Sequence, residues 1–550
     1  MLHSTVFNTS QICYELGIKH VVLSPGSRNA PLSISFARHK EIRKWVIPDE
    51  RAAGFVALGI AQEKKAPVAL CCTSGTALLN YAPAIAEAYY RQIPLIVLSA
   101  DRPPELIDQR DGQTIRQFEA LRNHVKYSAQ LPHVDNETEA NQYRKKLATS
   151  IQAALELPLG PVHINIPFRE PFYPSPEQKV QSSNAGHTKP RSTNFESEPF
   201  KLPEAKKIVI ISGQDEPYSG TQELLQEASK RIPVLKSPLN NSQHGIDYVD
   251  AFINDQSSLA PDLLITTGLS ILSKKLKNFI RNHKPHTHLH FDIAGVAVDT
   301  FQSNPQLIRA SFDECLEQLQ KQLVDEAFLN QWKFYAEESK QALLEFFADP
   351  PYSEATLTYR VLQRLPKNAI LHLSNSMPVR YADLFSVPMD VLCRSNRGTS
   401  GIDGCTSTAV GNALVSPKLN VLITGELAFL YDRNAFFHNY RLPNLKIIIM
   451  NNQGGGIFRL IEGPAKQPEL ETYFETRHNR TAEYICKENH LNYFSASSIR
   501  DLEAYWEAFM SSSDNASVLE LFSEPKANQT VYKDLRQFIN ERINSLEKSN

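Results

Sequence analysis

An acidic side chain, an asparagine pair and a run of glycines follow two short apolar stretches in the C-terminal third of the chain. Glu426 comes directly after the first stretch and its Gly425, and Asn451 and Asn452 come directly after the second, before the glycines at 454–456. Carboxylate and amide oxygens suit Mg²⁺, which proteins usually share with a phosphate group of a ligand. Consecutive glycines let such a ligand approach the backbone closely. These residues therefore predict a metal–phosphate site.

The elements around these residues are predicted to form a strand–helix–strand unit. Residues 421–424 and 445–450 are apolar apart from Lys446, which is typical of strands buried on both faces of a parallel sheet. Residues 427 to about 440 between them are predicted to form a helix. Because ligands bind at the carboxyl ends of strands in open α/β sheets, the two polar turns are expected to meet there. The alternative is an ordinary βαβ unit with polar turns.

Similar turns follow the predicted strands of the N-terminal third. Arg28 follows the strand His20–Leu23, and Arg102 follows the strand at 95–99. Between them, Glu50 opens a predicted helix of small residues, ERAAGFVALGIA. Taken singly, Glu50 fits a charge at a helix N-terminus and each Arg fits a solvated surface charge.

Length and composition limit the class of protein. With 550 residues the chain is too long for one core, and three or four domains are expected. A hydrophobic content of 42% and a net charge of −2 fit a globular protein without a nucleic-acid or anionic-membrane partner. Seven Cys without a CxxC pattern, no basic and apolar leader, and no membrane-length apolar run predict a cytoplasmic protein.

The order of strands and helices predicts an α/β fold of three doubly wound parallel-sheet domains. The expected domains are residues 1–175, 207–330 and 355–550. A Pro/Ser/Lys/Glu-rich connector is expected at 173–206, a charged helical region at 325–365 with a break at Pro350-Pro351, and a closing helix over about the last 25 residues.

Eight ordered motifs carry a resemblance to a known family: SPGSRNAPL, DERAAGFVALGIA, TSGTALLN, SADRPPEL, GQTIRQ, SNSMPVR, SNRGTSGIDG and NNQGGGIF. The chain resembles the thiamine-diphosphate (ThDP) enzymes over nearly its whole length, and the 27 residues from Gly425 to Asn452 fit the spacing of that family's metal–diphosphate motif. Within the family it is most similar to the 2-succinyl-5-enolpyruvyl-6-hydroxy-3-cyclohexene-1-carboxylate (SEPHCHC) synthases. The resemblance implies pyrimidine-binding, middle (transhydrogenase-like) and diphosphate-binding domains in that order.

The resemblance also implies roles for the cofactor residues. Glu50 matches the Glu that bonds the N1′ atom of the ThDP pyrimidine ring, and Ile402 matches the apolar residue that bends the cofactor. The implied cofactor set is Glu50, Ser27, Ile402, Gly425, Leu427, Asn452 and Gly455, and the implied ligands of Mg²⁺ or Mn²⁺ are Glu426, Asn452 and Gly454. One position departs from the family, whose metal-binding Asp is Glu426 here, a side chain longer by about 1.5 Å.

The implied substrates are 2-oxoglutarate and isochorismate, each with two carboxylates, and Arg suits bidentate binding of such groups. The reaction implied is decarboxylation of 2-oxoglutarate and 1,4-addition to isochorismate, giving SEPHCHC and CO₂ in menaquinone biosynthesis. The implied catalytic residues are Glu50, Gln113, Arg28, Ser376, Arg380 and Arg397. The implied substrate-binding residues are Arg28, Arg102, Gln113, Lys274, Lys275, Asn375, Ser376, Arg380, Arg397, Ile457 and Phe458.

Two alternatives stay open at this stage. Another ThDP-dependent 2-oxo-acid decarboxylase or carboligase would act on pyruvate without isochorismate, and the many Arg argue against it because pyruvate carries one carboxylate. A catalytically impaired ThDP-binding homologue is suggested only by Glu426. The resemblance further implies a homodimer or homotetramer.

His286, His288 and His290 alternate along a predicted strand at 288–292, with Asp292 continuing the alternation. Alternation places side chains on one face, so a zinc site is conceivable. Four ligands along one extended strand span too far for a single ion. We therefore predict that these histidines have a structural role and bind no metal.

Overall fold

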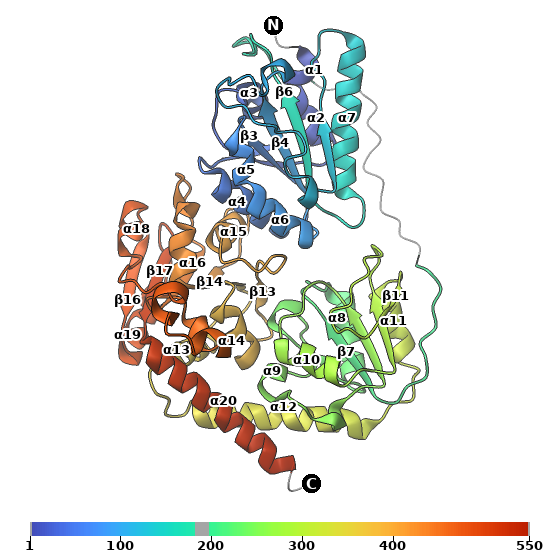
Figure 1. Ribbon diagram of the computed structural model, residues 1–550, viewed down its shortest axis with the longest axis vertical. Helices are drawn as coiled ribbons and strands as arrows, with labels where there is room; N and C mark the ends of the chain where they lie inside the picture. Colours follow the sequence, from blue (N-terminus) through green and yellow to red (C-terminus); the bar gives the residue numbers. More distant parts are fainter. Residues whose placement is uncertain (1–2, 182–196, 548–550) are drawn as a thin grey trace. The chain divides into compact units, whose positions relative to one another are not determined.

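The computed structural model describes residues 3–181 and 197–547 (Figure 1). Three parallel sheets with helices between their strands form the described chain, which confirms the predicted α/β class. Two compact units contain them. The first unit holds one sheet together with residues 396–417 and 430–445, and the second unit holds the other two sheets.

The sheet of the first unit has six strands in the order β2-β1-β3-β4-β6-β5. Its strands are β1 (His20–Leu23), β2 (Arg43–Val46), β3 (Val68–Cys72), β4 (Leu95–Asp101), β5 (Tyr127–Gln130) and β6 (Val162–Pro167). The helices of this unit are α1 (Ser4–Phe7), α2 (Thr9–Glu15), α3 (Ala30–Arg38), α4 (Glu50–Lys64), α5 (Thr76–Asn80), α6 (Ala82–Tyr90), α7 (Glu137–Leu155) and α15 (Cys405–Ala413).

The second unit contains a five-stranded and a six-stranded sheet, ordered β11-β10-β9-β7-β8 and β13-β12-β14-β15-β17-β16. The five strands are β7 (Ile208–Ser212), β8 (Val234–Leu235), β9 (Leu263–Thr267), β10 (Thr287–Phe291) and β11 (Gln306–Ile308). The six are β12 (Ile370–Leu373), β13 (Leu392–Arg394), β14 (Asn420–Gly425), β15 (Leu445–Asn451), β16 (Asn492–Ala496) and β17 (Ser517–Phe522).

The helices around these two sheets vary in length from four to 23 residues. They are α8 (Ser219–Ser229), α9 (Val249–Phe252), α10 (Lys274–Asn282), α11 (Phe312–Leu319), α12 (Glu326–Phe346), α13 (Glu354–Leu362), α14 (Met377–Phe385), α16 (Glu426–Tyr431), α17 (Glu462–Ala465), α18 (Glu483–Glu488), α19 (Ile499–Met510) and α20 (Pro525–Glu547). The closing helix α20 lies beside α12 (Figure 1), where Arg542 pairs with Glu338 and Glu345 at 2.8 Å each.

Strands β3, β4 and β15 are buried along their whole length, which explains their continuous apolar sequences. On one face of the first sheet, Val21 and Ala69 join a core with Tyr143 and Leu147 of α7. Alternate residues face the other side, where α4 contacts β1 and β3. Each strand therefore ends at a turn whose position is fixed by helices on both faces.

The helix predicted at 427–440 is too long. The structure has α16 over Glu426–Tyr431, then a 3₁₀ turn over Arg433–Phe436. Asp432 interrupts the helix because its buried carboxylate accepts hydrogen bonds from the Ser407 backbone N–H and hydroxyl group. This tertiary contact competes with the local propensity for a helix.

The expected connector at 173–206 has no helix or strand in the parts that the structure describes, 173–181 and 197–206, and its remaining residues lie outside the described part. The charged helical region is confirmed as α12 and α13, with the break at Pro350-Pro351 between them. The middle-sheet strand predicted at 288–292 is β10, one residue earlier at each end.

Helices α4 and α15 pack so closely that their glycines are required. A Cβ on Gly59 would lie 2.1 Å from the Thr408 backbone oxygen, and a Cβ on Gly411 would lie 2.0 Å from the Val56 backbone oxygen. Contacts below 3.0 Å to backbone cannot be relieved by a side-chain rotation. The small residues of α4 therefore allow its close packing against α15. Glu50 stands at the N-terminus of the same helix.

We predict that Gly59→Ala destabilises the protein, because the added methyl group forces α4 away from α15. The expected cost is roughly 1–3 kcal/mol, on the scale of overpacked cores. Thermal unfolding followed by circular dichroism measures it. Gly463→Ala is the matched control, since a Cβ there meets nothing within 4 Å. Equal midpoints for the two variants would contradict the packing argument.

Candidate active site

The turns after β14 and β15 meet at the carboxyl ends of adjacent strands. β14 ends at Gly425, and α16 begins at Glu426, whose side chain is buried. Glu426 Oε1 accepts a 2.7 Å hydrogen bond from the Gly454 N–H in the turn after β15. The structure therefore joins two of the three predicted metal ligands directly.

Asn452, the third predicted ligand, has one unused oxygen. Its Nδ2 donates to Glu354 Oε2 over 2.9 Å, and its Oδ1 is buried without a hydrogen-bond partner among the described residues. An unpaired buried acceptor costs free energy, and a cation would satisfy it. The described residues contain no group of three or more His, Cys, Asp or Glu able to hold a metal, and the three predicted ligands are a carboxylate, an amide and a backbone oxygen. This donor set fits Mg²⁺, which usually keeps positions for phosphate oxygens.

Glu354 was missed by the sequence analysis because it belongs to no motif. Its side chain is 4% exposed, and burial raises the pKa of its carboxyl to about 7. The Asn452 hydrogen bond opposes this rise, and the nearby Glu426 carboxylate adds to it. Glu354 therefore contacts Asn452 and also lies near the Glu426 carboxylate.

The segment around Glu475, which follows the glycine run in the chain, packs against the backbone of that run. The Glu475 backbone oxygen accepts a 2.8 Å hydrogen bond from the Gly455 N–H, and a Cβ on Gly454 would approach that oxygen to 2.8 Å. His478 Nε2 lies 3.5 Å from Glu426 Oε1. Glu475 and His478 carry no sequence signal that could have found them, since their placement depends on this backbone contact.

Glu50 is the first residue of α4, held by the N-cap Asp49, whose carboxylate accepts hydrogen bonds from the N–H groups of Arg51 and Ala52. Burial raises the pKa of the Glu50 carboxyl, and the Asp49 carboxylate adds to the rise, while a backbone hydrogen bond opposes it. A half-buried carboxyl with a raised pKa can share a proton with a ligand.

The SNRGTSGIDG segment, which carries Arg397 and Ile402, is fixed by a buried glutamate of α6. Glu87 is fully buried, and its two carboxylate oxygens accept hydrogen bonds from the N–H groups of Gly398 (2.8 Å) and Thr399 (2.7 Å). Ile402 is 37% exposed, which is high for an isoleucine. Glu87 therefore holds the segment that presents this apolar side chain, and the sequence analysis missed it.

The two predicted arginines of the first unit differ in exposure. Arg28 is 4% exposed, with its guanidinium over the Phe172 ring at 4.7 Å and its Nη1 donating to the Phe168 backbone oxygen over 3.1 Å. Arg102 is partly exposed, and its Nε lies 3.7 Å from Asp111 Oδ2. Arg28 is therefore the more rigidly placed of the two.

Gln113 lies in a loop that is anchored by Gln117. The buried Gln117 accepts a 3.0 Å hydrogen bond from the Gly75 N–H and donates to the Ala100 backbone oxygen and to Asn165 Oδ1. Gln113 itself has a φ of 56°, and its backbone lies against Gly75. The last residue of the GQTIRQ motif thus positions the loop that carries its second residue.

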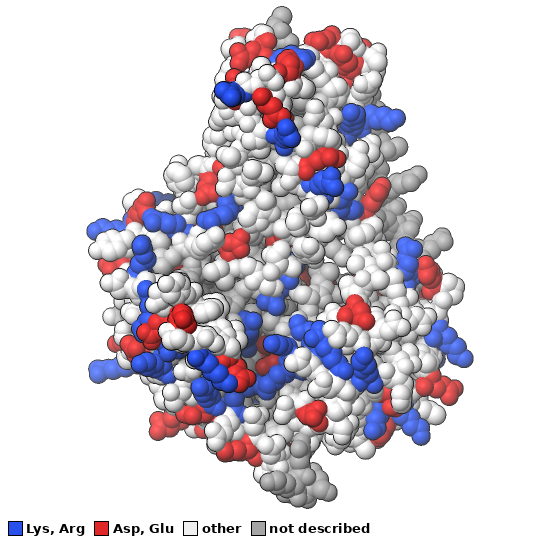
Figure 2. All heavy atoms as spheres, viewed as in Figure 1, with Lys and Arg blue, Asp and Glu red and all other residues white. Residues whose placement is uncertain are grey.

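The basic residues of the second unit lie at helix starts. Ser376 is the N-cap of α14 with a φ of 78°, and the Arg380 guanidinium donates to the Ser376 backbone oxygen. Lys274 begins α10 after the N-cap Ser273, whose hydroxyl group donates to Asp250 Oδ1 over 2.6 Å. Figure 2 shows Lys and Arg side chains gathered on this face over the region of α9, α10 and α14.

The predicted site residues are divided between the two compact units. The first unit holds Ser27, Arg28, Glu50, Arg102, Gln113, Arg397 and Ile402. The second holds Lys274, Lys275, Asn375, Ser376, Arg380, Gly425, Glu426, Leu427, Asn452, Gly454, Gly455, Ile457 and Phe458. Ile457 and Phe458 form a 3₁₀ turn after the glycine run, and Phe458 packs against Phe474 with ring centroids 5.7 Å apart.

The alternating histidines have structural partners. His288 Nε2 and His290 Nδ1 both hydrogen-bond Thr266 Oγ1, at 2.8 and 2.9 Å, and His288 Nδ1 bonds Ser303. His286 is exposed and lies 3.8 Å from Asp262. Burial lowers the pKa of His288 to about 4, so its ring is neutral at pH 7. These contacts explain the cluster without a metal.

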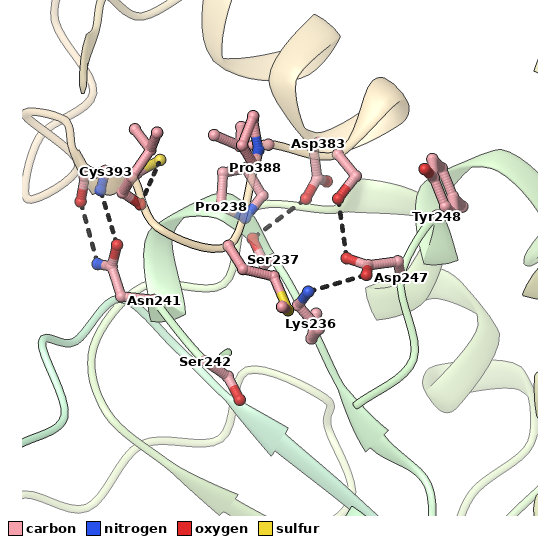
Figure 3. Close-up of a pocket in the computed structure, with 14 residues that line it drawn as sticks. Lys236, Ser237, Pro238, Asn241, Ser242, Asp247, Tyr248, Asp383, Pro388 and Cys393 are labelled. Atoms are coloured by element: carbon pink, nitrogen blue, oxygen red, sulfur yellow. Dashed lines mark hydrogen bonds and ion pairs between the residues drawn. The ribbon is translucent and has the colours of Figure 1, made fainter. Parts of the chain in front are cut away.

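A small cavity of about 40 Å³ in the second unit is lined by none of the predicted site residues (Figure 3). Its polar groups bond to one another. Lys236 Nζ lies 2.8 Å from Asp247 Oδ2, and the Ser237 hydroxyl group donates to Asp383 Oδ1 over 3.1 Å. The cavity therefore lies beside a network that connects residues after β8 to α14.

Comparison with known proteins identifies the family. Residues 9–121 match the family described as thiamine pyrophosphate enzyme, N-terminal TPP binding domain. A SEPHCHC synthase of Cytophaga hutchinsonii is 41% identical, with 97% of this chain and 98% of that protein covered. The synthases of Flavobacterium johnsoniae and Desulfotalea psychrophila are 39% and 37% identical over 95% and 93% of this chain, and over 96% and 97% of their own lengths.

The chain belongs to the SEPHCHC synthase family. It is therefore a ThDP-dependent enzyme, and the resemblance drawn from its motifs is confirmed. As a SEPHCHC synthase family member it departs from the ThDP motif at Glu426, where the buried carboxylate and the unused Asn452 oxygen nevertheless keep a donor set suited to a metal. None of the helices in residues 3–181 and 197–547 has the length and apolar content needed to span a lipid bilayer.

Proposed function

We propose that the chain decarboxylates 2-oxoglutarate and adds the remaining four-carbon unit to isochorismate in a 1,4 sense, giving SEPHCHC and CO₂ in menaquinone biosynthesis. The observation that carries this proposal is the extent of the likeness. Identities of 37–41% to SEPHCHC synthases extend over 93–97% of the chain, well beyond the TPP binding domain at 9–121. The similarity to SEPHCHC synthases therefore extends over the motifs that carry the predicted substrate-binding residues.

When bound, ThDP supplies the nucleophilic carbon that adds to the 2-oxo group and holds the electron pair left when CO₂ departs. The chain's own residues bind and tune it. We assign Glu50 the role of sharing a proton with N1′ of the pyrimidine ring, which its raised pKa supports. Ile402 supports the bent form of the cofactor, and the remaining cofactor residues are Ser27, Gly425, Leu427, Asn452 and Gly455.

We assign Mg²⁺ or Mn²⁺ to Glu426 and Asn452 side-chain oxygens and the Gly454 backbone oxygen. The buried, unpaired Oδ1 of Asn452 supports this assignment. A divalent cation held by these residues would offset the negative charge of the diphosphate.

The basic residues are assigned to the four carboxylates of the two substrates, because arginine offers paired, planar hydrogen-bond donors. Ile457 and Phe458 are assigned to the apolar wall against the isochorismate ring. The carboxylate-binding and polar set is Arg28, Arg102, Gln113, Lys274, Lys275, Asn375, Ser376, Arg380 and Arg397, of which Arg28, Gln113, Ser376, Arg380 and Arg397 act at the reacting atoms.

We further propose a homodimer or homotetramer in the cytoplasm, with domains at 1–175, 207–330 and 355–550. Seven free cysteines, all buried, support a reducing compartment.

Incubating the purified protein with 2-oxoglutarate, isochorismate, ThDP and Mg²⁺ tests the function. SEPHCHC and CO₂ are expected in equal amounts. Turnover of pyruvate without isochorismate would favour another ThDP decarboxylase or carboligase. Cofactor binding without turnover of any 2-oxo acid would favour an impaired homologue.

We predict that Glu50→Gln keeps ThDP binding and slows exchange of the cofactor's C2 proton by about 10²–10⁴-fold, the usual contribution of a positioned acid–base group. Proton exchange of bound ThDP, followed by NMR after quenching, measures this. Glu63→Gln in the same helix is the control and should exchange at the parent rate. An unchanged rate in Glu50→Gln would remove Glu50 from this role.

We predict that Glu50 and Glu426 serve one ThDP from two different chains. Mixing inactive Glu50→Gln and inactive Asn452→Ala chains should restore activity, because a mixed dimer has one site with two unaltered faces. Random pairing gives about a quarter of the parent activity in a symmetric dimer. A fully active monomer in analytical ultracentrifugation, or no recovery after subunit exchange, would contradict the shared site.

We predict that Glu426→Gln weakens the apparent Mg²⁺ affinity roughly tenfold or more, a scale reached even by changes outside the ligand shell. Glu426→Asp should leave it unchanged or tighter, since it keeps the charge and restores the residue of the ThDP family. Activity against Mg²⁺ and Mn²⁺ concentration at saturating ThDP measures both. If Glu426→Gln titrates like the parent, Glu426 is not a ligand.

A further inference from the structure

Glu354 lies outside the eight motifs that carry the resemblance and 98 residues before the asparagine that it contacts. It is the first residue of α13, where the N-cap Ser353 accepts a hydrogen bond from the Thr356 N–H. The Glu354 backbone N–H donates to Asn528 Oδ1 over 2.8 Å. The start of the helix is thus held from two sides, and the Glu354 side chain has a fixed origin.

The Glu354 carboxylate determines which way the Asn452 amide faces. Glu354 Oε2 accepts a hydrogen bond from the amide nitrogen of Asn452 over 2.9 Å, so the nitrogen end of the amide faces Glu354. The amide oxygen must then face the opposite side, where it is buried and unpaired among the described residues. Without Glu354, an amide nitrogen and an amide oxygen would compete for the same position, and only the oxygen can bind a cation.

We propose that Glu354 is a positioning residue for the metal, which turns the Asn452 oxygen toward the cation and holds it there. This inference rests on the proposed metal site at Glu426, Asn452 and Gly454. Groups outside the ligand shell that orient a ligand commonly change metal affinity by 10–100-fold.

The chain offers a matched control in the neighbouring residue pair. Glu520 is also fully buried, and its Oε1 accepts a 2.7 Å hydrogen bond from Asn451 Nδ2. Asn451 directly precedes Asn452 but is not a proposed ligand. Glu520 also accepts hydrogen bonds from the Ala482 N–H and the Tyr493 hydroxyl group, and it lies near Glu426 as Glu354 does. Glu520→Gln therefore removes a buried carboxylate from the same sheet edge without touching the orientation of Asn452.

The test measures Mn²⁺ binding to the full-length protein with ThDP present, by electron paramagnetic resonance of free Mn²⁺. Glu354→Gln keeps the size of the side chain but lets it pair with either end of the Asn452 amide. We expect its Mn²⁺ dissociation constant to rise about tenfold or more. Glu520→Gln should bind Mn²⁺ within about twofold of the parent, because the amide that Glu520 bonds belongs to Asn451, which is not a proposed ligand.

A compensating double variant separates orientation from general damage. In Glu354→Gln combined with Asn452→Asp, the new carboxylate has an oxygen on both sides, so that one accepts from the glutamine amide and the other is free for the metal. This double variant should recover Mn²⁺ affinity to near the parent value, and it also serves if the single Glu354→Gln variant does not fold.

The results of these measurements distinguish the positioning role of Glu354 from the proposed metal site on which it rests. Parent-like Mn²⁺ binding by Glu354→Gln, or equal weakening in Glu354→Gln and Glu520→Gln, or no recovery in the double variant, would overturn the positioning role. Parent-like Mn²⁺ binding by Asn452→Ala would instead overturn the proposed metal site itself.

Discussion

The hydrogen bond from the Gly454 N–H to the Glu426 carboxylate fixes the separation of two turns that belong to successive strands. β14 and β15 are buried neighbours, so their ends are placed by the sheet, but the turns beyond them are held by this bond. The glycines allow it, since the Glu475 backbone lies where a side chain on Gly454 would be. The proposed metal site and the adjoining Ile457–Phe458 turn both depend on that backbone geometry.

Buried carboxylates serve elsewhere in the molecule as anchors for loops. Burying a charge is costly unless its oxygens are bonded, so a buried Glu holds whatever donors satisfy it. Glu87 binds the N–H groups of Gly398 and Thr399, and Glu520 binds Asn451 and the Ala482 N–H. Each anchor fixes a segment next to a proposed site residue. Loops that handle a charged cofactor are thereby held rigid without regular secondary structure.

The sequence predicts those parts of the fold that depend on local pattern. Continuous apolar runs predicted β3, β4 and β15, and the polar turn residues predicted where Glu426 and Asn452 would lie. What it could not predict depends on distant partners. The helix expected to reach residue 440 ends at Tyr431 because Asp432 bonds Ser407, and the bond between Glu87 and Gly398 spans 311 residues. Glu354 escaped for the same reason, since it lies outside the quoted motifs and its partner Asn452 is 98 residues away.

The longer side chain at position 426 need not loosen the metal site. Among residues 3–181 and 197–547, the Gly454 N–H and His478 Nε2 contact the Glu426 carboxylate, and both contacts are made to Oε1. With one oxygen fixed by a backbone donor, the carboxylate plane has little freedom, and Oε2 is the atom left for a cation. Mg²⁺ demands defined ligand directions more than any particular chain length. A glutamate with one carboxylate oxygen held by a hydrogen bond can therefore direct its other oxygen as Mg²⁺ requires. A shorter aspartate meets the same requirement because its side chain has fewer conformations.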